Sequence, residues 1–301
     1  MPNPVIIINN PLTTNYDNLI KQTIPKIIGS NRLDLLIKCE ITNVTNLNDI
    51  LYNYYNLIRN EINKLNFEDY NFQINIIFNI SLDKYRTLIK KWNHIFIAET
   101  EQNLINSKLP IPISSINCEL PPTELSSSCN KSFKQFNTTA VGGTFDHLHD
   151  GHKILLSMAY FLTSKRMIIG ITGNELLKNK KFIEVLESFS VRKQSVINFL
   201  DIIIDDNNLR FEIYEINDIC GPTGYLPDID SLIISHETLK GGEFVNNYRR
   251  DIGFKELDVT AINIIGDEDS NEKNSWRGKL SSTDIREREM NKLKKFNSID
   301  F

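Results

Sequence analysis

Residues 138–164 read TTAVGGTFDHLHDGHKILLSMAYFLTS, and this stretch decides how the second half of the chain is interpreted. Thr138–Val141 is a short apolar and β-branched run that predicts a strand, and Gly142 and Gly143 follow it as a turn. In residues 151–164 the apolar side chains recur at the helical period. A strand, a glycine turn and a helix in immediate succession begin a βαβ unit, which indicates a parallel sheet.

The same alternation of strands and helices continues towards the C-terminus. Further strands are predicted at Met167–Thr172, Phe211–Ile216, Ser231–Ser235 and Val259–Ile265, and helices at Ser190–Ile204, Gly242–Arg250 and Thr283–Lys295. We therefore expect residues 137–301 to form an α/β domain with a doubly wound, parallel, five-stranded sheet. Ligands of such sheets bind beyond the carboxyl ends of the strands, so the loops that follow the strands should carry the chemistry.

The first part of the chain predicts a smaller α/β domain over residues 1–100. Strand-like runs at Val5–Ile8, Leu35–Ile41 and Phe72–Ile80 alternate there with helical patterns at Asn15–Ile28 and Leu47–Leu65. No catalytic motif occurs in this domain, and its role stays open. Residues 101–136 are rich in Ser, Asn and Pro, which is typical of a linker.

The composition excludes several classes of function. The 301 residues carry 34 basic and 38 acidic side chains, a net charge of −4, so no global field attracts nucleic acid or an anionic membrane. The 4 cysteines form no metal-binding spacing. No apolar run approaches the roughly 18 residues of a membrane span. We expect a cytoplasmic protein, with the nucleus left open, that has neither a membrane span nor a nucleic-acid partner.

Three histidines, His147, His149 and His152, fall within six residues at the start of the first helix of this domain. A helix N-terminus presents free N–H groups and a positive dipole end, and imidazoles three residues apart can face the same phosphate. Zinc is the other interpretation, but it needs a third or fourth protein ligand and no thiolate lies nearby. The cluster therefore favours a phosphate site.

Two further segments carry groups that can bind phosphate. Lys178, Lys180 and Lys181 follow the second strand of the domain, and Arg192 enters the next helix. Spacing alone does not decide which of these lysines meets the reacting phosphates. Residues 279–286 read KLSSTDIR and place hydroxyl groups at a second helix start, with an arginine one turn further on.

Together, GGTFDHLHDGH at 142–152 and KLSSTDIR at 279–286 resemble the HxGH and ISSTxxR signatures of the nucleotidyltransferase superfamily. Between them, LLKNKK, the GPTG at Gly221–Gly224 and SHETLKGGEFVNNYRR at Ser235–Arg250 resemble the eukaryotic type of phosphopantetheine adenylyltransferase. The likeness covers roughly residues 137–295. It implies a Rossmann-like nucleotidyltransferase domain that converts ATP and 4′-phosphopantetheine to dephospho-coenzyme A and pyrophosphate, a step of coenzyme A biosynthesis. No GxxxxGK[ST] kinase loop is present, so the chain resembles the monofunctional fungal form.

The resemblance also implies a set of site residues. Catalysis is expected of His152, His149 and Lys178. ATP binding is expected of Gly142, Gly143, Thr144, Phe145, His149, Gly151, His152, Ser281, Ser282, Thr283 and Arg286. Binding of 4′-phosphopantetheine is expected of Thr144, Lys178, Lys180 and Arg192. Mg²⁺ should arrive with ATP rather than in a protein cage. Association with other enzymes of the coenzyme A pathway is a further expectation.

Other interpretations remain open at this point. A nicotinamide mononucleotide adenylyltransferase carries a similar C-terminal signature, although the middle segments argue against it. A cytidylyltransferase would show an RTxGxST pattern, and an aminoacyl-tRNA synthetase a KMSKS-like loop, and neither is present. An inactive adaptor would have little physical reason to retain the set His149, Gly151, His152, Lys178 and Arg286. The sequence leaves open the role of His147, the oligomeric state of the protein and whether coenzyme A regulates it.

Overall fold

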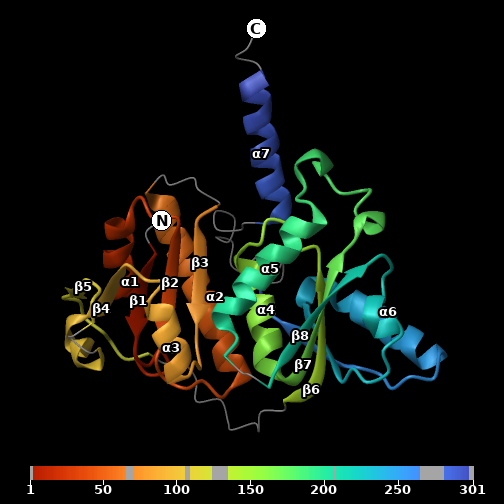
Figure 1. The fold of residues 1–301 in the computed structure, drawn as a ribbon, viewed down its shortest axis with the longest axis horizontal. Coiled ribbons are helices and arrows are strands. Elements are labelled where there is room, and N and C mark those ends of the chain that lie inside the picture. Colours follow the sequence, from red (N-terminus) through yellow and green to blue (C-terminus); the bar gives the residue numbers. More distant parts are fainter. Residues whose placement is uncertain are drawn as a thin grey trace. The chain divides into compact units, whose positions relative to one another are not determined.

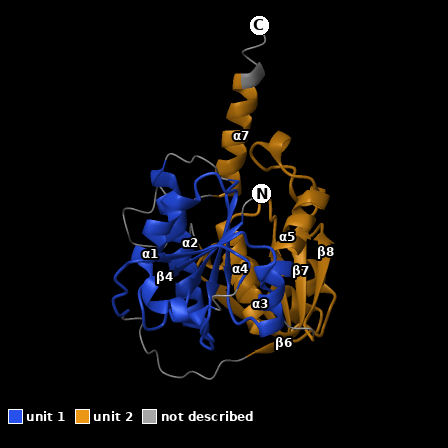
Figure 2. Cartoon of the chain, turned by 60° about the vertical axis from the view of Figure 1, so that its left-hand side comes forward, with its two compact units in different colours: residues 1–133, 201–205 blue, residues 134–200, 206–301 orange. Residues whose placement is uncertain are grey.

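The computed structural model describes residues 3–65, 71–105, 109–123, 135–205, 208–264 and 281–297 (Figure 1). The chain divides into two compact units, residues 1–133 with 201–205 and residues 134–200 with 206–301 (Figure 2). Each unit contains its own five-stranded sheet. Every strand pairing in both sheets is parallel, so the expected α/β fold class is confirmed.

The first unit is built on a parallel sheet between helices. Its strands are β1 (Pro4–Ile8), β2 (Arg32–Ile37), β3 (Gln73–Ile77), β4 (His94–Ala98) and β5 (Ile113–Ile116), and its helices are α1 (Asp17–Thr23), α2 (Val44–Lys64) and α3 (Leu82–Ile89). The strand order is β3-β2-β1-β4-β5. All five residues of β1 are buried, as expected of a central strand that is covered on both faces.

Part of the expected linker belongs to the first sheet. Residues 113–116, inside the predicted segment 101–136, form β5 and pair in parallel with β4. β5 lies at the edge of the sheet, where a strand is paired on one side only and where polar residues and nearby prolines are tolerated. The composition of this segment therefore resembles that of a linker although it contains a strand. Residues 106–108 and 124–134 of the same segment lie outside the described residues.

Asp34 is a buried carboxylate in the first unit, and it is fully enclosed. It accepts hydrogen bonds at 2.8 Å from Arg32 Nε, Asn75 Nδ2 and Trp92 Nε1. Asp34→Asn should lower the free energy of unfolding by about 2 kcal/mol, because the Arg32 guanidinium loses a charged partner. Urea unfolding measures this change. Catalytic turnover should not change, and a loss of turnover in the folded variant would contradict this assignment to the first unit alone.

The second unit repeats the doubly wound arrangement. Its strands are β6 (Phe136–Gly143), β7 (Thr163–Thr172), β8 (Arg210–Ile216), β9 (Ser231–Ser235) and β10 (Asp258–Ile262), and its helices are α4 (Asp150–Leu162), α5 (Phe189–Ile203), α6 (Leu239–Asp251) and α7 (Ser282–Asn297). The strand order is β10-β9-β6-β7-β8. The order reverses between β6 and β9, and ligands of open α/β sheets bind beyond such a switch point.

The predicted elements of this unit are present, with small shifts at their ends. Gly142 and Gly143 belong to the end of β6 rather than to a turn, because each pairs with a residue of β7. The last predicted strand ends at Ile262, and residue 265 lies outside the described residues. The chain leaves β6 through residues 144–149 and enters α4, as the motif predicts.

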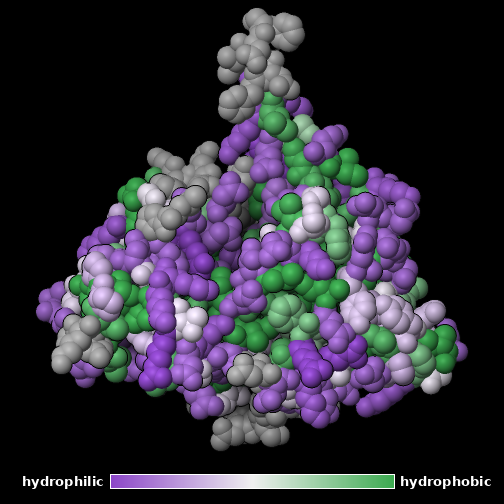
Figure 3. All heavy atoms as spheres, in the orientation of Figure 1, coloured by the Kyte–Doolittle hydropathy of each residue, from purple (hydrophilic) through white to green (hydrophobic). Residues whose placement is uncertain are grey.

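Hydrophilic side chains cover much of the face drawn in Figure 3, with hydrophobic ones between them. Large apolar side chains that are exposed include Phe244 and Tyr248 of α6 and Ile252, which directly follows that helix. Among the helices of the described residues, none is both long enough and apolar enough to cross a membrane.

Candidate active site

A cavity of about 960 Å³ opens at the carboxyl ends of the second sheet, where β6 and β9 diverge. The structure brings many of the predicted residues together on its wall. These are Gly142, Gly143, Thr144, His149, His152, Lys180, Ser281, Ser282, Thr283 and Arg286. Segments that are far apart in the sequence therefore converge on one site, at the edge where a doubly wound sheet binds ligands.

Small residues on the sheet surface give the cavity its depth. Gly142 of β6 and Gly170 of β7 are paired neighbours, and both line the cavity. A Cβ atom at Gly170 would come within 3.1 Å of Ile216, so a larger residue would crowd this wall. Apolar side chains, among them Ile168 and Leu232, line the same part of the cavity. A cavity with a largely apolar wall and a few polar groups is typical of a small-molecule site.

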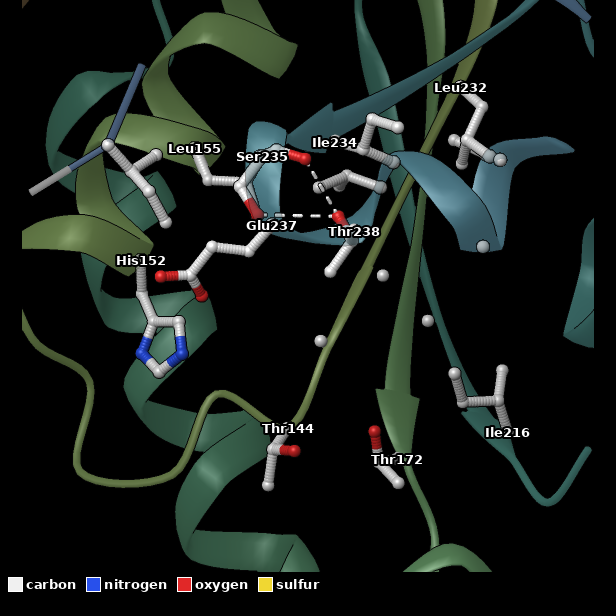
Figure 4. Close-up of a pocket in the computed structure, with 18 of the residues that line it drawn as sticks. Thr144, His152, Leu155, Thr172, Ile216, Leu232, Ile234, Ser235, Glu237 and Thr238 are labelled. Carbon is white, nitrogen blue, oxygen red and sulfur yellow. Dashed lines mark hydrogen bonds between the residues drawn. The ribbon is translucent and has the colours of Figure 1, made fainter. Parts of the chain in front are cut away.

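The histidine pair stands at the start of α4. His149 occupies the N-cap position with an extended backbone and makes no side-chain cap. Its ring stacks on that of His152, with 3.9 Å between the ring centres, and Phe145 packs against His152 at 5.3 Å. Figure 4 shows the His152 ring beside the cavity, with the carboxylate of Glu237 turned towards it. The stack fixes both rings at a helix end that favours anions.

Burial and the neighbouring His149 lower the pKa of His152 well below its usual value of 6.5. His152 is therefore neutral at physiological pH. A neutral imidazole carries one N–H and one acceptor nitrogen. Within the described residues, the buried Nδ1 of His152 has no hydrogen-bond partner. The ring can therefore donate one hydrogen bond to a phosphate oxygen without first gaining a proton.

This lowered pKa gives a testable pH dependence of stability. Below about pH 6.5 His152 becomes protonated in the unfolded chain but stays neutral in the folded protein, because its pKa is lowered there. The free energy of unfolding therefore falls as the pH falls. His152→Gln removes this contribution. Between pH 7 and pH 5 the variant should lose less stability than the wild type, as measured by urea unfolding without ligand. An equal loss in both proteins would show that His152 titrates normally.

The start of α7 forms the opposite wall. Ser281 Oγ donates to Asp284 Oδ2 at 2.6 Å, and Asp284 N donates back to Ser281 Oγ at 3.2 Å. These reciprocal bonds cap the helix. Ser282 Oγ donates to the backbone carbonyl of Asp146 at 2.8 Å, which ties α7 to the loop after β6. Residues 279 and 280 of the predicted motif lie outside the described residues.

The two candidate lysines differ in position. Lys178 is 67% exposed and pairs with Glu175 at 2.6 Å, and it does not line the cavity. Lys180 does line it. The sequence predicts Lys178 as the bridge between phosphates with Lys180 as the alternative, and the geometry favours Lys180. Spacing could not separate them because the segment is an irregular loop between two short 3-10 turns.

Arg192 also departs from the predicted role. The sequence predicts a contact with the acceptor phosphate, but the guanidinium is fully buried. It donates to the carbonyls of Thr144 at 2.7 Å, Thr172 at 2.9 Å and Glu187 at 3.1 Å. Burial lowers the pKa of Arg192 from its usual value. Arg192 therefore ties together the segments that follow β6 and β7. Phe145 and Gly151 were expected at the ATP site, but both are buried and neither lines the cavity.

Comparison with known proteins fits this geometry. A family model described as cytidylyltransferase-like matches residues 140–288. A phosphopantetheine adenylyltransferase of Saccharomyces cerevisiae is 35% identical over 288 residues, which cover 94% of this chain and 91% of the yeast protein. The chain belongs to the phosphopantetheine adenylyltransferase family. A phosphopantetheine adenylyltransferase of Pyrococcus abyssi is 36% identical over 152 residues, which are 50% of this chain and 90% of the archaeal protein. Half of this chain thus suffices to match nearly all of an archaeal adenylyltransferase.

Several residues of this adenylyltransferase-family site were not predicted from the sequence. Thr172 ends β7 and Ser235 ends β9, and Glu237 and Thr238 follow β9 directly. All four line the cavity (Figure 4). Thr238 Oγ1 donates to the Ser235 carbonyl at 3.0 Å, which closes this turn. The sequence did carry a signal for these residues, because each lies at or directly after the carboxyl end of a predicted strand, where ligands of such sheets bind. Single Thr, Ser and Glu residues are too common in loops for position alone to select them.

His147, to which the sequence assigned no role, faces away from the cavity of this adenylyltransferase-family fold. Its Nε2 lies 3.1 Å from the carbonyl of Val185 and 3.7 Å from Glu289 Oε2, and its backbone N–H donates to Glu187 Oε2 at 2.7 Å. These partners belong to the loop after β7 and to α7. The third histidine of the motif is therefore a structural contact between segments.

Proposed function

We propose that this chain transfers the adenylyl group of ATP to 4′-phosphopantetheine and releases pyrophosphate, forming dephospho-coenzyme A. One observation carries the proposal. In a chain of this family, the stacked His149 and His152 at the start of α4 share a cavity with the start of α7. Two helix N-termini and a lysine then surround one space, which suits a polyphosphate beside a second phosphate. We place the reaction in the cytoplasm, with other coenzyme A enzymes as potential partners.

The acceptor phosphate needs little chemical activation. A phosphate monoester has a second pKa of about 6, so it is largely a dianion at neutral pH. Its oxygen attacks the α-phosphorus of ATP in line, a new P–O bond forms, and the bond from the α-phosphorus to the bridging oxygen breaks as pyrophosphate leaves. The protein's task is to position two polyanions and to stabilise the charge that develops on the α-phosphate oxygens.

Each cavity residue has a role that matches its position. His152 donates a hydrogen bond to the α-phosphate, and the stacked His149 holds the ring in place and adds a second polar edge. Lys180 bridges the acceptor phosphate and the α-phosphate. Thr144 and the α4 amides bind nearby oxygens. The β- and γ-phosphates lie at the start of α7, where Ser281, Ser282, Thr283 and Arg286 line the cavity.

We propose that Mg²⁺ enters as part of the substrate, bound to the triphosphate of ATP. Mg²⁺ keeps several waters and is usually held by substrate phosphates with one or two carboxylates. Glu237 is a carboxylate on the cavity wall that could approach such an ion through water. Within the described residues no group of three or more His, Cys, Asp or Glu is placed to hold a metal.

Pyrophosphate release tests the proposal directly. The full chain is incubated with ATP and Mg²⁺ and is offered either 4′-phosphopantetheine or nicotinamide mononucleotide. We expect release with 4′-phosphopantetheine alone. Release only with the mononucleotide would replace the proposed acceptor by the alternative one. Absence of pyrophosphate release with both acceptors would favour an inactive protein that retains the fold.

A further inference from the structure

Asp146 is a charged residue in the segment between β6 and α4, and it does not line the cavity. Its side chain is fully buried. One carboxylate oxygen accepts a hydrogen bond from Glu187 N at 2.9 Å, and the other pairs with Arg286 Nη1. The backbone carbonyl of Asp146 accepts the bond from Ser282 Oγ. A single residue after β6 therefore holds both the loop after β7 and the start of α7.

Arg286 completes the connection from the other side. Its side chain is 3% exposed, and its Nε donates to the carbonyl of Lys181 at 2.9 Å. Its Nη2 donates to Thr283 Oγ1 at 3.2 Å. The residue next to Lys181 is Lys180, the lysine on the cavity wall. The Asp146–Arg286 pair thus fixes two phosphate-binding segments relative to each other.

The backbone around Asp146 supports the same conclusion. Phe145 has φ = 51° and His147 has φ = 45°, so two non-glycine residues in the left-handed region flank Asp146. Such conformations are costly and persist where the surroundings impose them. His147 N donates to Glu187 Oε2, and Asp146 accepts from Glu187 N, so this loop and residue 187 hold each other through two bonds.

We propose that Asp146 is a positioning residue for ATP: through Arg286 and Ser282 it holds the start of α7 against the loop that carries Lys180. It touches no substrate, and its effect reaches the β- and γ-phosphates through α7. This inference rests on the proposed function for its kinetic readout. Its binding readout depends only on ATP and not on the identity of the acceptor.

The primary experiment measures Mg-ATP binding to the full chain by calorimetry, without an acceptor. Asp146→Asn should weaken binding by about tenfold, because the guanidinium of Arg286 loses its anchor and the start of α7 shifts. The KM for ATP should rise by a similar factor, while the KM for 4′-phosphopantetheine should stay within about threefold. A purely structural residue would lower the amount of active enzyme without separating the two KM values.

Matched variants isolate the effect. Asp34→Asn also removes a buried carboxylate from an arginine, but in the first unit, so it should leave Mg-ATP binding unchanged. Asp146→Glu keeps a negative charge beside Arg286, while its extra methylene displaces the guanidinium, so it should also weaken ATP binding. In a double-mutant cycle, Asp146→Asn should add little to Arg286→Met, because the two residues act through one contact.

Several outcomes would overturn the proposal. Wild-type Mg-ATP affinity in both Asp146 variants would do so, as would equal rises in both KM values or fully additive effects in the double mutant. Absence of Mg-ATP binding by the wild type would reject this inference together with the ATP site. Binding of Mg-ATP by the wild type without turnover of 4′-phosphopantetheine would reject the proposed acceptor alone, and the Asp146 comparison would still decide the inference.

Discussion

His152→Ala should lower kcat for adenylyl transfer by about 10² to 10³, the effect typical of losing one hydrogen-bond donor that acts in the transition state. The ring is stacked on His149, packed by Phe145 and neutral, so it is oriented before substrate arrives. Charge develops on the α-phosphate oxygens as the P–O bond forms. A donor aimed at those oxygens stabilises the transition state more than the bound ATP, so kcat should fall more than affinity.

Pyrophosphate release under saturating ATP and 4′-phosphopantetheine measures this loss, and urea unfolding confirms that the variant is folded. His94→Ala is the matched control, because that histidine stacks on Phe96 in the first unit and contacts Ser114 Oγ at 2.8 Å. It should leave kcat unchanged. A turnover number of His152→Ala within about fivefold of the wild type would remove His152 from the chemical step.

The sequence predicted the second unit well because its signals are local. The strand before Gly142 and the helix after His149 follow from hydrophobic periodicity within a few residues, and the structure places both there. The first unit was predicted less completely. β4 (His94–Ala98) was missed although it is an apolar run as long as β1, and β5 is polar at Ser114 and Ser115, so it lacks the apolar pattern of a strand. Their pairing depends on contacts that are distant in sequence.

The site shows the same division. The sequence predicted which segments carry phosphate-binding groups, since these follow from helix starts and strand ends. It did not predict which charged side chains reach the cavity. Arg192 and Arg286 have the same residue type and the same motif-like setting, yet Arg192 is enclosed by three carbonyls and Arg286 pairs with Asp146 beside the cavity. Side-chain partners of this kind arise only when the chain is folded.

The two units also show that topology alone does not make a site. Each sheet places its first strand at the centre, with the second and third strands on one side and the fourth and fifth on the other. In the first unit, the loop after β1 pairs with residues 121–123: Asn15 N donates to the Pro121 carbonyl at 2.8 Å, and Thr123 N donates to the Thr13 carbonyl at 3.1 Å. That edge is occupied by its own chain, whereas the second unit leaves a cavity there.

Lys180→Ala should lower kcat/KM by at least about a hundredfold, with the larger share in kcat. The two substrates bring at least four negative charges into one cavity, and the lining of that cavity also holds the carboxylate of Glu237. A positioned ammonium between the acceptor phosphate and the α-phosphate offsets this repulsion most strongly when the new P–O bond forms. Losing such a contact in a site partly shielded from water costs about 3 kcal/mol.

Lys178→Ala is the matched control for this prediction. It removes the same charge from the same loop, two residues away, but its side chain is 67% exposed and pairs with Glu175. Exposed ion pairs of this kind contribute little, so kcat/KM should fall less than about threefold. Lys180→Arg should recover only part of the activity, because a planar guanidinium does not reproduce a compact ammonium. If Lys178→Ala instead gave the hundredfold loss and Lys180→Ala were nearly normal, the loop would have to rearrange when substrates bind, and Lys178 would then be the bridging residue.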